Sequence, residues 1–559
     1  MRSVSLLTLM FGILLVTTSC EKAPASEQPA ASETAIPFTL SQATAEAGLA
    51  NFTHATGASG EKWFPETMGS GAAIVDIDND GWQDILLVGG ATWTADDTTP
   101  ALLLYRNNQD GSFSDISKAA GLSGMQAYGF GVATADYDND GDQDIALTTL
   151  EGTRLLQNNE GVFINVSRQA GLAVATDWHS TALFFDADRD GWLDLYLGGY
   201  VDWSPEDDIF CTLDGTNKSY CTPELYNGTP GTFFYNNGDG TFSDQTAARG
   251  FADAPGKTLG AAMLDYNKDG APDLIVSNDT QRDLLYENDG TGIFTEKGQL
   301  SGIAFDENGK ARAGMGIDTG FIDGGNDETV FVGNFSKEMI AVYHHIGDGL
   351  FVDRAARSKI GRPSLLTLTF GLALLDIDLD ADLDLFTANG HLQVEIENTQ
   401  EGIAYKQTPH LFLNDGTGVF SDVADRLTNF PALVGRGIAY GDLDNDGDLD
   451  VLITENGGPA FLWRNDLSQA ANYLRIKLAG TSSNRDALGS LVELYAGGTK
   501  QIRYTRTGSS YLSQSETIAT FGLNITTVVD SLRITWPSGK QQLQTNVQAN
   551  QLLMLTEPQ

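Results

Sequence analysis

The sequence predicts an all-β protein, a seven-bladed β-propeller followed by a small C-terminal β domain. Three observations predict this fold: an acidic nine-residue pattern that recurs along the chain, short apolar runs on both sides of each copy, and a recurring aromatic block around an Asn/Asp-Gly turn. Glycine is frequent, at 62 of 559 residues, and this favours turn-rich β structure over long helices. A chain of this length exceeds one ordinary core, so a repeat array or several domains are expected.

The acidic pattern is D-x-D-x-D-G-x-x-D, and it occurs six times. Asn replaces the second acid in the fourth copy, and Ala381 replaces the glycine in the fifth. The residues at positions 1, 3, 5 and 9 are Asp76, Asp78, Asp80 and Asp84; Asp136, Asp138, Asp140 and Asp144; Asp186, Asp188, Asp190 and Asp194; Asp265, Asn267, Asp269 and Asp273; Asp376, Asp378, Asp380 and Asp384; Asp442, Asp444, Asp446 and Asp450. The apolar runs beside each copy predict buried strands.

A seventh, degenerate copy lies in the longest gap between copies, which runs from Asp265 to Asp376 and is about twice as long as the others. The residues at its positions 1, 3, 5 and 9 are Phe321, Asp323, Gly325 and Thr329. Its flanking strand pattern survives while the metal ligands are lost. We therefore expect seven repeats, of which six carry a metal loop.

Each repeat offers about four strands, because a second block follows most loops. This block has aromatic runs around an Asn/Asp-Gly turn, as in residues 234–242, and such a turn is a strong hairpin signal. Four strands in roughly 60 residues match a propeller blade. The last repeat ends near Asp466 without its final strand, whereas the chain begins at Phe38 with that missing part. The N-terminal strand should therefore complete the last blade; an open solenoid is the alternative.

The six acidic loops predict calcium sites. Oxygen ligands at positions 1, 3, 5 and 9, a backbone carbonyl at position 7 and Gly at position 6 suit Ca²⁺, whereas Mg²⁺ demands tighter octahedral geometry. Position 12 is never Glu and the flanks are strands, so these are not EF-hands. We expect about six structural Ca²⁺ ions, with a regulatory calcium switch as the weaker alternative.

The strong negative charge agrees with this assignment. The chain has 75 Asp and Glu against 33 Lys and Arg, a formal charge of −42, and such a surface repels phosphate backbones. Of these acids, 23 are Asp at ligand positions of the six loops. We expect no nucleic-acid partner.

The N-terminus predicts export. Arg2 precedes an apolar run that is too short for a membrane span, and residues 15–20 are similar to a bacterial lipobox that ends at Cys20. We expect lipidation at Cys20, no other membrane contact, and a place in the cell envelope as an outer-membrane lipoprotein; plain secretion is the alternative. The predicted parts are a signal peptide over 1–20, a flexible tether over 21–37, the propeller over 38–466 and the β domain over 467–559.

Two cysteines remain, Cys211 and Cys221, and in an oxidising compartment they could close a small loop; free thiols are the alternative. They lie in an insertion, residues 200–226, which lengthens the third repeat. Loops on a rigid scaffold often bind partners, so this insertion is the best single candidate for a recognition surface, while a decorated loop without a binding role is the simpler alternative.

Two motifs then connect the chain to a known family. Residues 128–131 (Tyr-Gly-Phe-Gly) and 370–371 (Phe-Gly) resemble the FG-GAP repeat of integrin α-subunit propellers. Residues 481–489, 508–514, 521–523 and 536–540 resemble the ASPIC/UnbV domain. Together they are similar to the cartilage acidic protein family, including bacterial members. The resemblance implies a Ca²⁺-binding, integrin-α-like propeller with a small β domain, and no settled biochemical activity.

No catalytic motif stands out. The chain has six His, and no zinc-protease, nucleophile-elbow or Ser-His-Asp pattern occurs. His391 is a possible ligand but more simply a blade-turn residue, and the polar run Asn484, Arg485 and Asp486 is best explained as a turn. We expect a binding or adhesion module for an unknown protein or glycan. The alternatives are a carbohydrate-active lyase or hydrolase using the propeller face, and a structural component of the envelope.

Overall fold

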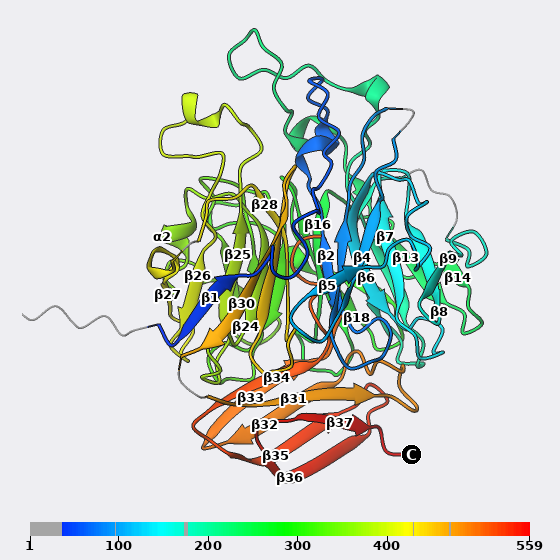
Figure 1. The fold of residues 1–559 in the computed structure, drawn as a ribbon, viewed down its shortest axis with the longest axis vertical. Helices are drawn as coiled ribbons and strands as arrows, with labels where there is room; N and C mark the ends of the chain where they lie inside the picture. The colour runs from blue at the N-terminus through cyan, green and yellow to red at the C-terminus, as the bar shows by residue number, and fades with distance from the viewer. Residues whose placement is uncertain (1–35, 95–96, 173–176, 429, 469–470) are drawn as a thin grey trace, which may run out of the picture. The chain divides into compact units, whose positions relative to one another are not determined.

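The computed structural model describes residues 36–94, 97–172, 177–428, 430–468 and 471–559 (Figure 1). The chain divides into two units, Met1–Ile36 and Pro37–Gln559. The expected signal peptide over 1–20 and Cys20 lie outside the described residues, as does the expected tether up to residue 35.

Seven four-stranded antiparallel sheets follow one another between residues 38 and 467 of the described chain, and we number these blades 1 to 7. Blade 1 is β2 (Ala72–Val75), β3 (Asp84–Val88), β4 (Leu102–Asn107) and β5 (Phe113–Asp115); blade 2 is β6 (Gly129–Ala135), β7 (Asp144–Thr149), β8 (Arg154–Asn159) and β9 (Val162–Asn165). Blade 3 is β10 (His179–Phe185), β11 (Asp194–Gly199), β13 (Thr232–Asn236) and β14 (Phe242–Asp244); blade 4 is β16 (Thr258–Leu264), β17 (Asp273–Asn278), β18 (Leu284–Asn288) and β19 (Phe294–Glu296).

Blade 5 is the degenerate repeat, and it has the same four strands. They are β20 (Ile317–Gly320), β21 (Thr329–Val332), β22 (Ala341–His345) and β23 (Phe351–Asp353). Blade 6 is β24 (Thr369–Leu375), β25 (Asp384–Asn389), β26 (Leu411–Asn414) and β27 (Phe420–Asp422). Blade 7 is β28 (Gly435–Gly441), β29 (Asp450–Glu455), β30 (Ala460–Leu467) and β1 (Phe38–Gln42).

The sheets close into a ring. The first strand of each blade contacts the first strand of the next, in the order β2, β6, β10, β16, β20, β24, β28 and back to β2. The N-terminal strand β1 pairs antiparallel with β30, with Phe38 opposite Leu467 and Leu40 opposite Asn465, which confirms that the two ends of the propeller share a blade. Because each end supplies the other with a partner, the closing blade has no missing strand.

The cores lie between neighbouring blades. One cluster joins blades 1 and 2 around Ile145 and Leu86, and equivalent clusters join each later pair up to blades 5 and 6. Another joins blades 7 and 1 through Leu452 and Ile85. The strands buried on both faces explain the continuous apolar runs in the sequence.

The C-terminal strands form two further sheets, drawn orange to red in Figure 1. One contains β34 (Ala519–Asn524), β31 (Asn472–Ala479) and β37 (Leu552–Thr556); the other contains β33 (Thr499–Tyr504), β32 (Leu491–Ala496), β35 (Val528–Thr535) and β36 (Gln541–Gln548). Their shared core holds Trp536 and Phe521. The remaining short elements are β12 (Thr229–Pro230), β15 (Pro255–Gly256), α1 (Gly298–Ser301), α2 (Gly361–Ser364), η1 (Phe64–Thr67), η2 (Pro205–Asp207), η3 (Pro223–Leu225), η4 (Ile396–Asn398) and η5 (Ala424–Arg426).

The segment 507–516, between β33 and β34, hydrogen-bonds to the first strands of several blades. Ser510 exchanges two backbone hydrogen bonds with Ile317 of blade 5, and the Leu512 carbonyl accepts from Val132 of blade 2. A Cβ on Gly71, just before β2, would lie 1.7 Å from the Leu512 oxygen, so only glycine permits this approach. The motif that resembles the ASPIC/UnbV domain therefore packs against the inner strands of the propeller.

Candidate metal sites

Each acidic loop connects the first and second strands of its blade, and five of the six bring three carboxylates together. In these groups the ligand atoms lie within 4.8 Å of one another. The groups are Asp76, Asp78 and Asp80; Asp136, Asp138 and Asp144; Asp186, Asp188 and Asp190; Asp376, Asp378 and Asp384; Asp442, Asp444 and Asp446. In blade 4 the amide of Asn267 replaces one carboxylate and donates to Asp269 at 2.9 Å. These positions match the spacing in the sequence.

The ninth residue closes every loop through the backbone. In blade 1, Asp84 Oδ2 accepts from the Ile77 N–H at 3.1 Å, and Oδ1 accepts from the Asn107 N–H at 2.7 Å. Asp144, Asp194, Asp273, Asp384 and Asp450 accept the equivalent pair of bonds in their own blades. This carboxylate ties the start of the loop to the third strand as well as facing the cluster.

The first residue holds the turn and points an oxygen at the cluster. In blade 7, Asp442 Oδ2 accepts from the Gly447 N–H at 2.9 Å, and the first acid of every other loop accepts from position 6 in the same way. Ala381 takes this place in blade 6 with φ +91°, the left-handed conformation that glycine supplies in the other five loops. The loop shape therefore persists without the glycine.

Several of these carboxylates have an oxygen that is buried and has no protein partner. Asp76 and Asp442 are 7% and 1% exposed, and the Oδ1 of each accepts no hydrogen bond. Oδ1 of Asp138, Asp188 and Asp378 is likewise buried and has no hydrogen-bond partner among the described residues. Buried, unpaired carboxylate oxygens that converge on one point are costly unless a cation binds them. The residues present therefore fit an oxygen-liganded divalent ion such as Ca²⁺.

The electrostatics agree with this fit. Burial, with a smaller effect of the neighbouring acids, raises the pKa of Asp144 to about 9 and that of Asp273 to about 8. Without a cation these carboxyl groups resist ionisation, because charged oxygens would be desolvated and close to like charges. A bound divalent ion would supply the missing opposite charge.

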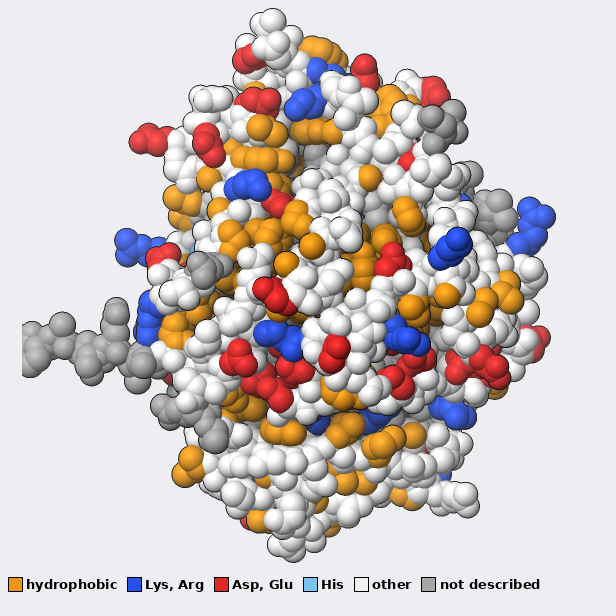
Figure 2. Space-filling view, viewed as in Figure 1, with side chains coloured by type: hydrophobic (Ala, Val, Ile, Leu, Met, Phe, Trp, Pro, Cys, Tyr) orange, Lys and Arg blue, Asp and Glu red, His pale blue; other side chains and the backbone are white. Residues whose placement is uncertain are grey.

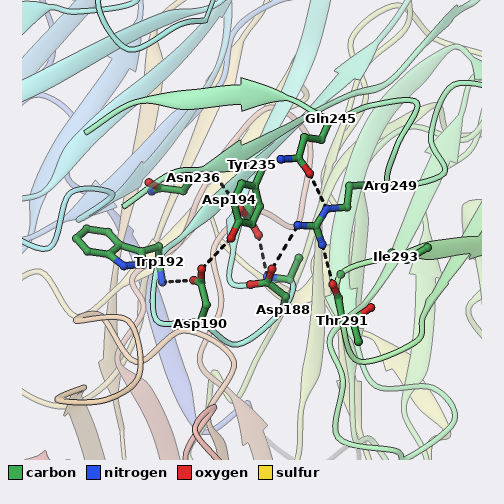
Figure 3. A network of polar contacts seen from close by, with 12 residues as sticks. Asp188, Asp190, Trp192, Asp194, Tyr235, Asn236, Gln245, Arg249, Thr291 and Ile293 are labelled. Atoms are coloured by element: carbon green, nitrogen blue, oxygen red, sulfur yellow. Dashed lines mark hydrogen bonds and ion pairs between the residues drawn. The ribbon is translucent and has the colours of Figure 1, made fainter. Parts of the chain in front are cut away.

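Blade 3 shows how surrounding side chains support the loop (Figure 3). Arg249 donates to Asp188 Oδ2 at 3.3 Å and is held by Gln245 and the carbonyl of Thr291. The Tyr235 hydroxyl donates to Asp190 Oδ2 at 3.0 Å. These donors occupy the outer oxygens and leave Asp188 Oδ1 free for the cluster.

A ring of buried asparagines links the blades, and sequence reasoning missed its role. Asn158 Nδ2 donates to the carbonyl of Ile77 in the preceding blade at 3.2 Å and to that of Gln143 in its own at 3.1 Å. The other members of this asparagine latch are Asn107, Asn236, Asn288, Asn414 and Asn465, each of which donates to a loop carbonyl of the preceding blade. Asn recurs near the end of the third strand in six of the seven blades, but in the sequence this recurrence indicates only a hairpin turn.

The degenerate loop of blade 5 is stabilised by an arginine in place of a cation site. The guanidinium of Arg506, from the segment after β33, contacts Asp318 Oδ1 at 2.7 Å and lies 4.0 Å from Glu328 Oε1. It also donates to the hydroxyl and carbonyl of Thr319. Asp318 and Glu328 are 2% and 6% exposed, so this positive charge is their main compensation in the described structure.

Other cations of the C-terminal strands contact first acids directly. Arg475 lies 2.7 Å from Asp442 Oδ2, and Lys477 Nζ lies 3.1 Å from Asp76 Oδ2. Figure 2 shows Asp and Glu side chains gathered with Lys and Arg in a band where the propeller meets these strands. The loops therefore lie against the C-terminal domain rather than open to solvent on all sides.

The polar run 484–486 does more than hold a turn. Asn484 bonds twice to Leu488 and does hold the turn. Asp486, however, accepts from the Asp136 N–H at 2.8 Å and from Gln143 at 2.7 Å, so it belongs to the surroundings of the acidic loop of blade 2.

The remaining candidates lie elsewhere. Cys211 and Cys221 form a disulfide. His391 is 1% exposed, accepts from the Gln393 N–H and packs edge-on against Phe335, as a structural histidine does. None of the helices in the described residues is long and apolar enough to cross a membrane.

Comparison with known proteins matches one family to the repeats and another to the C-terminal residues. The FG-GAP-like repeat family matches residues 76–147, 136–197, 206–276 and 402–453, and the ASPIC and UnbV family matches residues 480–559. Cartilage acidic protein 1 of Mus musculus is 24% identical over 470 residues, covering 74% of this chain and 71% of the relative, and that of Xenopus tropicalis is 24% identical over 505 residues, covering 85% and 71%. A solved structure of YCF48 bound to D1 peptide is 10% identical with a TM-score of 0.40, covering 77% of this chain and 96% of that one.

Proposed function

Because the chain carries FG-GAP-like repeats and a C-terminal ASPIC and UnbV domain and is related to cartilage acidic protein 1, we propose that it is a calcium-stabilised propeller that acts as an extracytoplasmic binding module. The observation that supports calcium most strongly is the convergence of buried, unpartnered carboxylate oxygens in the loops. About six ions are proposed, one for each loop. Their role is structural, because each loop joins two strands of a blade.

The calcium proposal has a direct test on the purified full chain. After chelator treatment and desalting, calorimetric titration with CaCl₂ should give close to six sites, and each site filled at 100 times its dissociation constant adds about 2.7 kcal/mol to the free energy of unfolding. The melting temperature should fall in EDTA and return with excess CaCl₂, whereas MgCl₂ should restore less of it. An unchanged melting temperature in EDTA, with no heat on titration, would contradict the proposal.

The binding role is proposed for an unidentified protein or glycan. The insertion 200–226, closed by the Cys211–Cys221 disulfide, supports it by exposing Phe210 and Leu225, whose side chains are 64% and 55% exposed. Tyr220 of the same insertion bonds to Glu66 and Gln393 and lies under the Lys62 ammonium, so the loop is fixed by two other segments, around residues 62–66 and at Gln393. A fixed loop with exposed apolar side chains is suited to recognition.

The proposed location is the bacterial envelope, through a lipid on Cys20. A Cys20→Ala variant, expressed with its signal sequence, should move from the membrane fraction to the soluble fraction. Retention in the membrane fraction would contradict lipid anchoring while leaving the calcium proposal untouched.

A further inference from the structure

The acidic loops of blades 6 and 7 carry the same acids but differ in the cations beside them. Both have Asp at positions 1, 3, 5, 7 and 9, namely Asp376, Asp378, Asp380, Asp382 and Asp384 in blade 6 and Asp442, Asp444, Asp446, Asp448 and Asp450 in blade 7. We infer that the residue just before the latch asparagine, on the third strand of each blade, sets how tightly the loop of that blade binds calcium. The inference rests on the proposed calcium binding and adds that the sites differ in affinity, with blade 6 binding more tightly than blade 7.

The residue before the latch asparagine, which we call the tuning residue, faces the acidic loop of its own blade. In blade 7 it is Arg464, whose Nη1 donates to Asp444 Oδ2 at 2.6 Å. In blade 2 it is Gln157, whose Nε2 donates to Asp138 Oδ2 at 2.7 Å. Both acceptors occupy position 3 of their loops, so the same place on the strand reaches the same ligand. The tuning residues of the six acidic loops are Arg106, Gln157, Tyr235, Glu287, Leu413 and Arg464.

Blade 7 has two cations paired with its loop. Arg464 Nε also lies 3.8 Å from Asp450 Oδ2, and Arg475 of β31 lies 2.7 Å from Asp442 Oδ2. Ligand oxygens of Asp442, Asp444 and Asp446 still converge within 4.8 Å, so the arrangement of the site is kept. A calcium ion entering this loop meets two guanidinium charges that already compensate part of the acid charge, and like charges repel. The two arginines should therefore weaken this site.

Blade 6 has an apolar tuning residue. The side chain of Leu413 carries no charge and no hydrogen-bond donor. In the part of the chain that the structure describes, no Lys or Arg forms an ion pair with a carboxylate of this loop. Arg503 of β33 attracts Asp376 and Asp382 from a longer distance, and it donates to the carbonyl of Ile502 at 2.9 Å. The loop therefore keeps the attraction of its acids for a calcium ion.

The two tuning residues occupy equivalent places, so they can be exchanged. Leu413 lies opposite Ser421 in blade 6, and Arg464 lies opposite Ser41 in blade 7. Both side chains are partly buried. Arg464 also donates to the carbonyl of Gly111 in blade 1 at 3.0 Å, so its replacement removes one neutral hydrogen bond besides the ion pairs. The exchange thus alters the charge beside each loop while each strand receives a residue that the same place already holds in another blade.

The first measurement compares the two sites in the full chain by equilibrium dialysis against buffered concentrations of radioactive calcium. The binding curve of one blade is the difference between the unaltered chain and a variant that lacks the position-3 ligand of that blade. Asp378→Ala serves for blade 6, and Asp444→Ala serves for blade 7. Because charge is the main difference between the loops, the midpoint for blade 6 should lie at a free calcium concentration at least about tenfold lower than that for blade 7. Equal midpoints, or a lower midpoint for blade 7, would contradict the inference.

The second measurement tests the cause by exchange of the tuning residues, with the position-3 alanine placed in the same background for each difference curve. Arg464→Leu should lower the midpoint of blade 7 at least about tenfold, and Leu413→Arg should raise that of blade 6 by about the same factor. Arg533→Leu is the control, because it removes a half-exposed arginine of β35 that lies 3.7 Å from Glu493, and it should move neither midpoint. If Arg464→Leu does not fold, Arg464→Gln takes its place, since blade 2 carries Gln here and the amide can still donate to position 3.

Opposite shifts in the two exchange variants, with none in Arg533→Leu, support the inference. An unshifted midpoint in either folded exchange variant, or a shift of equal size in Arg533→Leu, overturns it. Calcium bound at several sites of unchanged affinity would overturn this inference alone and leave the proposed function standing. A chain that binds no calcium would overturn both.

Discussion

Blade 2 and blade 5 have the same four strands but different ways of holding their loops. In blade 2, the carboxylates of Asp138 and Asp144 converge, and Asn158 latches the blade to its neighbour. In blade 5, Asp318 and Glu328 instead face the guanidinium of Arg506, and His345 stands in the latch position. In both blades the first and second strands pair antiparallel.

This difference separates two functions of the repeat that coincide in the other blades, namely forming the blade and compensating the charge of its loop. The blade fold depends on apolar strands and backbone pairing, since blade 5 keeps both without the acids. In the proposed function the acids of the other loops bind a free cation, whereas blade 5 has a cation fixed to the chain, the Arg506 guanidinium. A covalent cation needs no free calcium, but it ties the propeller to its C-terminal domain.

The largest effect should come from removing the fixed cation. Arg506→Met leaves Asp318 and Glu328 buried without their main compensation, so we expect the free energy of unfolding to fall by about 3–5 kcal/mol. Chemical denaturation with saturating CaCl₂ measures it. Arg533→Met is the control, because Arg533 is half exposed and lies 3.7 Å from Glu493, so its loss should cost less than about 1 kcal/mol. Equal effects in the two variants would refute the role assigned to Arg506.

The second-largest effect should come from removing one latch asparagine. Asn158→Ala leaves two carbonyls and the Gly161 N–H without this partner, so the free energy of unfolding should fall by about 3 kcal/mol. The adjacent Asn159 is exposed, and Asn159→Ala should change it by no more than about 0.5 kcal/mol. If Asn158→Ala behaves like Asn159→Ala, the latch contributes nothing to stability.

The same substitution can be made at position 3 of an acidic loop and at position 3 of the degenerate loop. Asp138→Ala removes the position-3 ligand from a full loop, whereas Asn would keep a ligand oxygen, as Asn267 does in blade 4. Calorimetry should count one calcium ion fewer, and up to about 2.7 kcal/mol of calcium-dependent stability is lost at 100 times the dissociation constant. Asp323→Ala alters the same position of the degenerate loop and should leave the count unchanged. A reduced count in Asp323→Ala would mean that blade 5 also binds calcium.

The smallest effect concerns pH. Burial raises the pKa of Asp136 to about 7 and that of Asp144 to about 9, so the folded, calcium-free chain holds more protons than the unfolded chain between about pH 4 and 9. Its stability should therefore fall as pH rises through this window. Calcium must displace these protons, so its apparent affinity should rise from pH 6 to pH 8.5. Melting curves and calcium titrations at several pH values measure both trends, and opposite slopes would contradict the raised pKa values.

Much of the fold was predictable because its signals are local. A strand between two turns, an acidic loop of fixed spacing and a missing last strand can each be recognised within one repeat. The degenerate copy was found in the same way, from apolar flanks around Phe321 and Thr329. The pairing of β1 with β30 followed from counting strands, since a ring must complete its last blade.

The contacts that were not predictable join residues far apart in the chain. Arg506 and Asp318 are separated by 188 residues, and Asp486 and Asp136 by 350. The sequence around a lone arginine or a short polar run does not show which distant residue it contacts, so it predicts only a turn at Asp486. The latch asparagines did recur in the sequence, but their acceptors are backbone carbonyls, which every residue has.

The sequence by itself determined the blades, the ring closure and the oxygen-rich loops, because periodic burial and fixed spacing act over a few residues. Only the tertiary structure decided what surrounds each loop: a cluster of buried carboxylates in blade 2 and a fixed guanidinium in blade 5. The physical reason is that charge compensation in a buried site depends on distance in space. Chain order alone does not say which cation will be there.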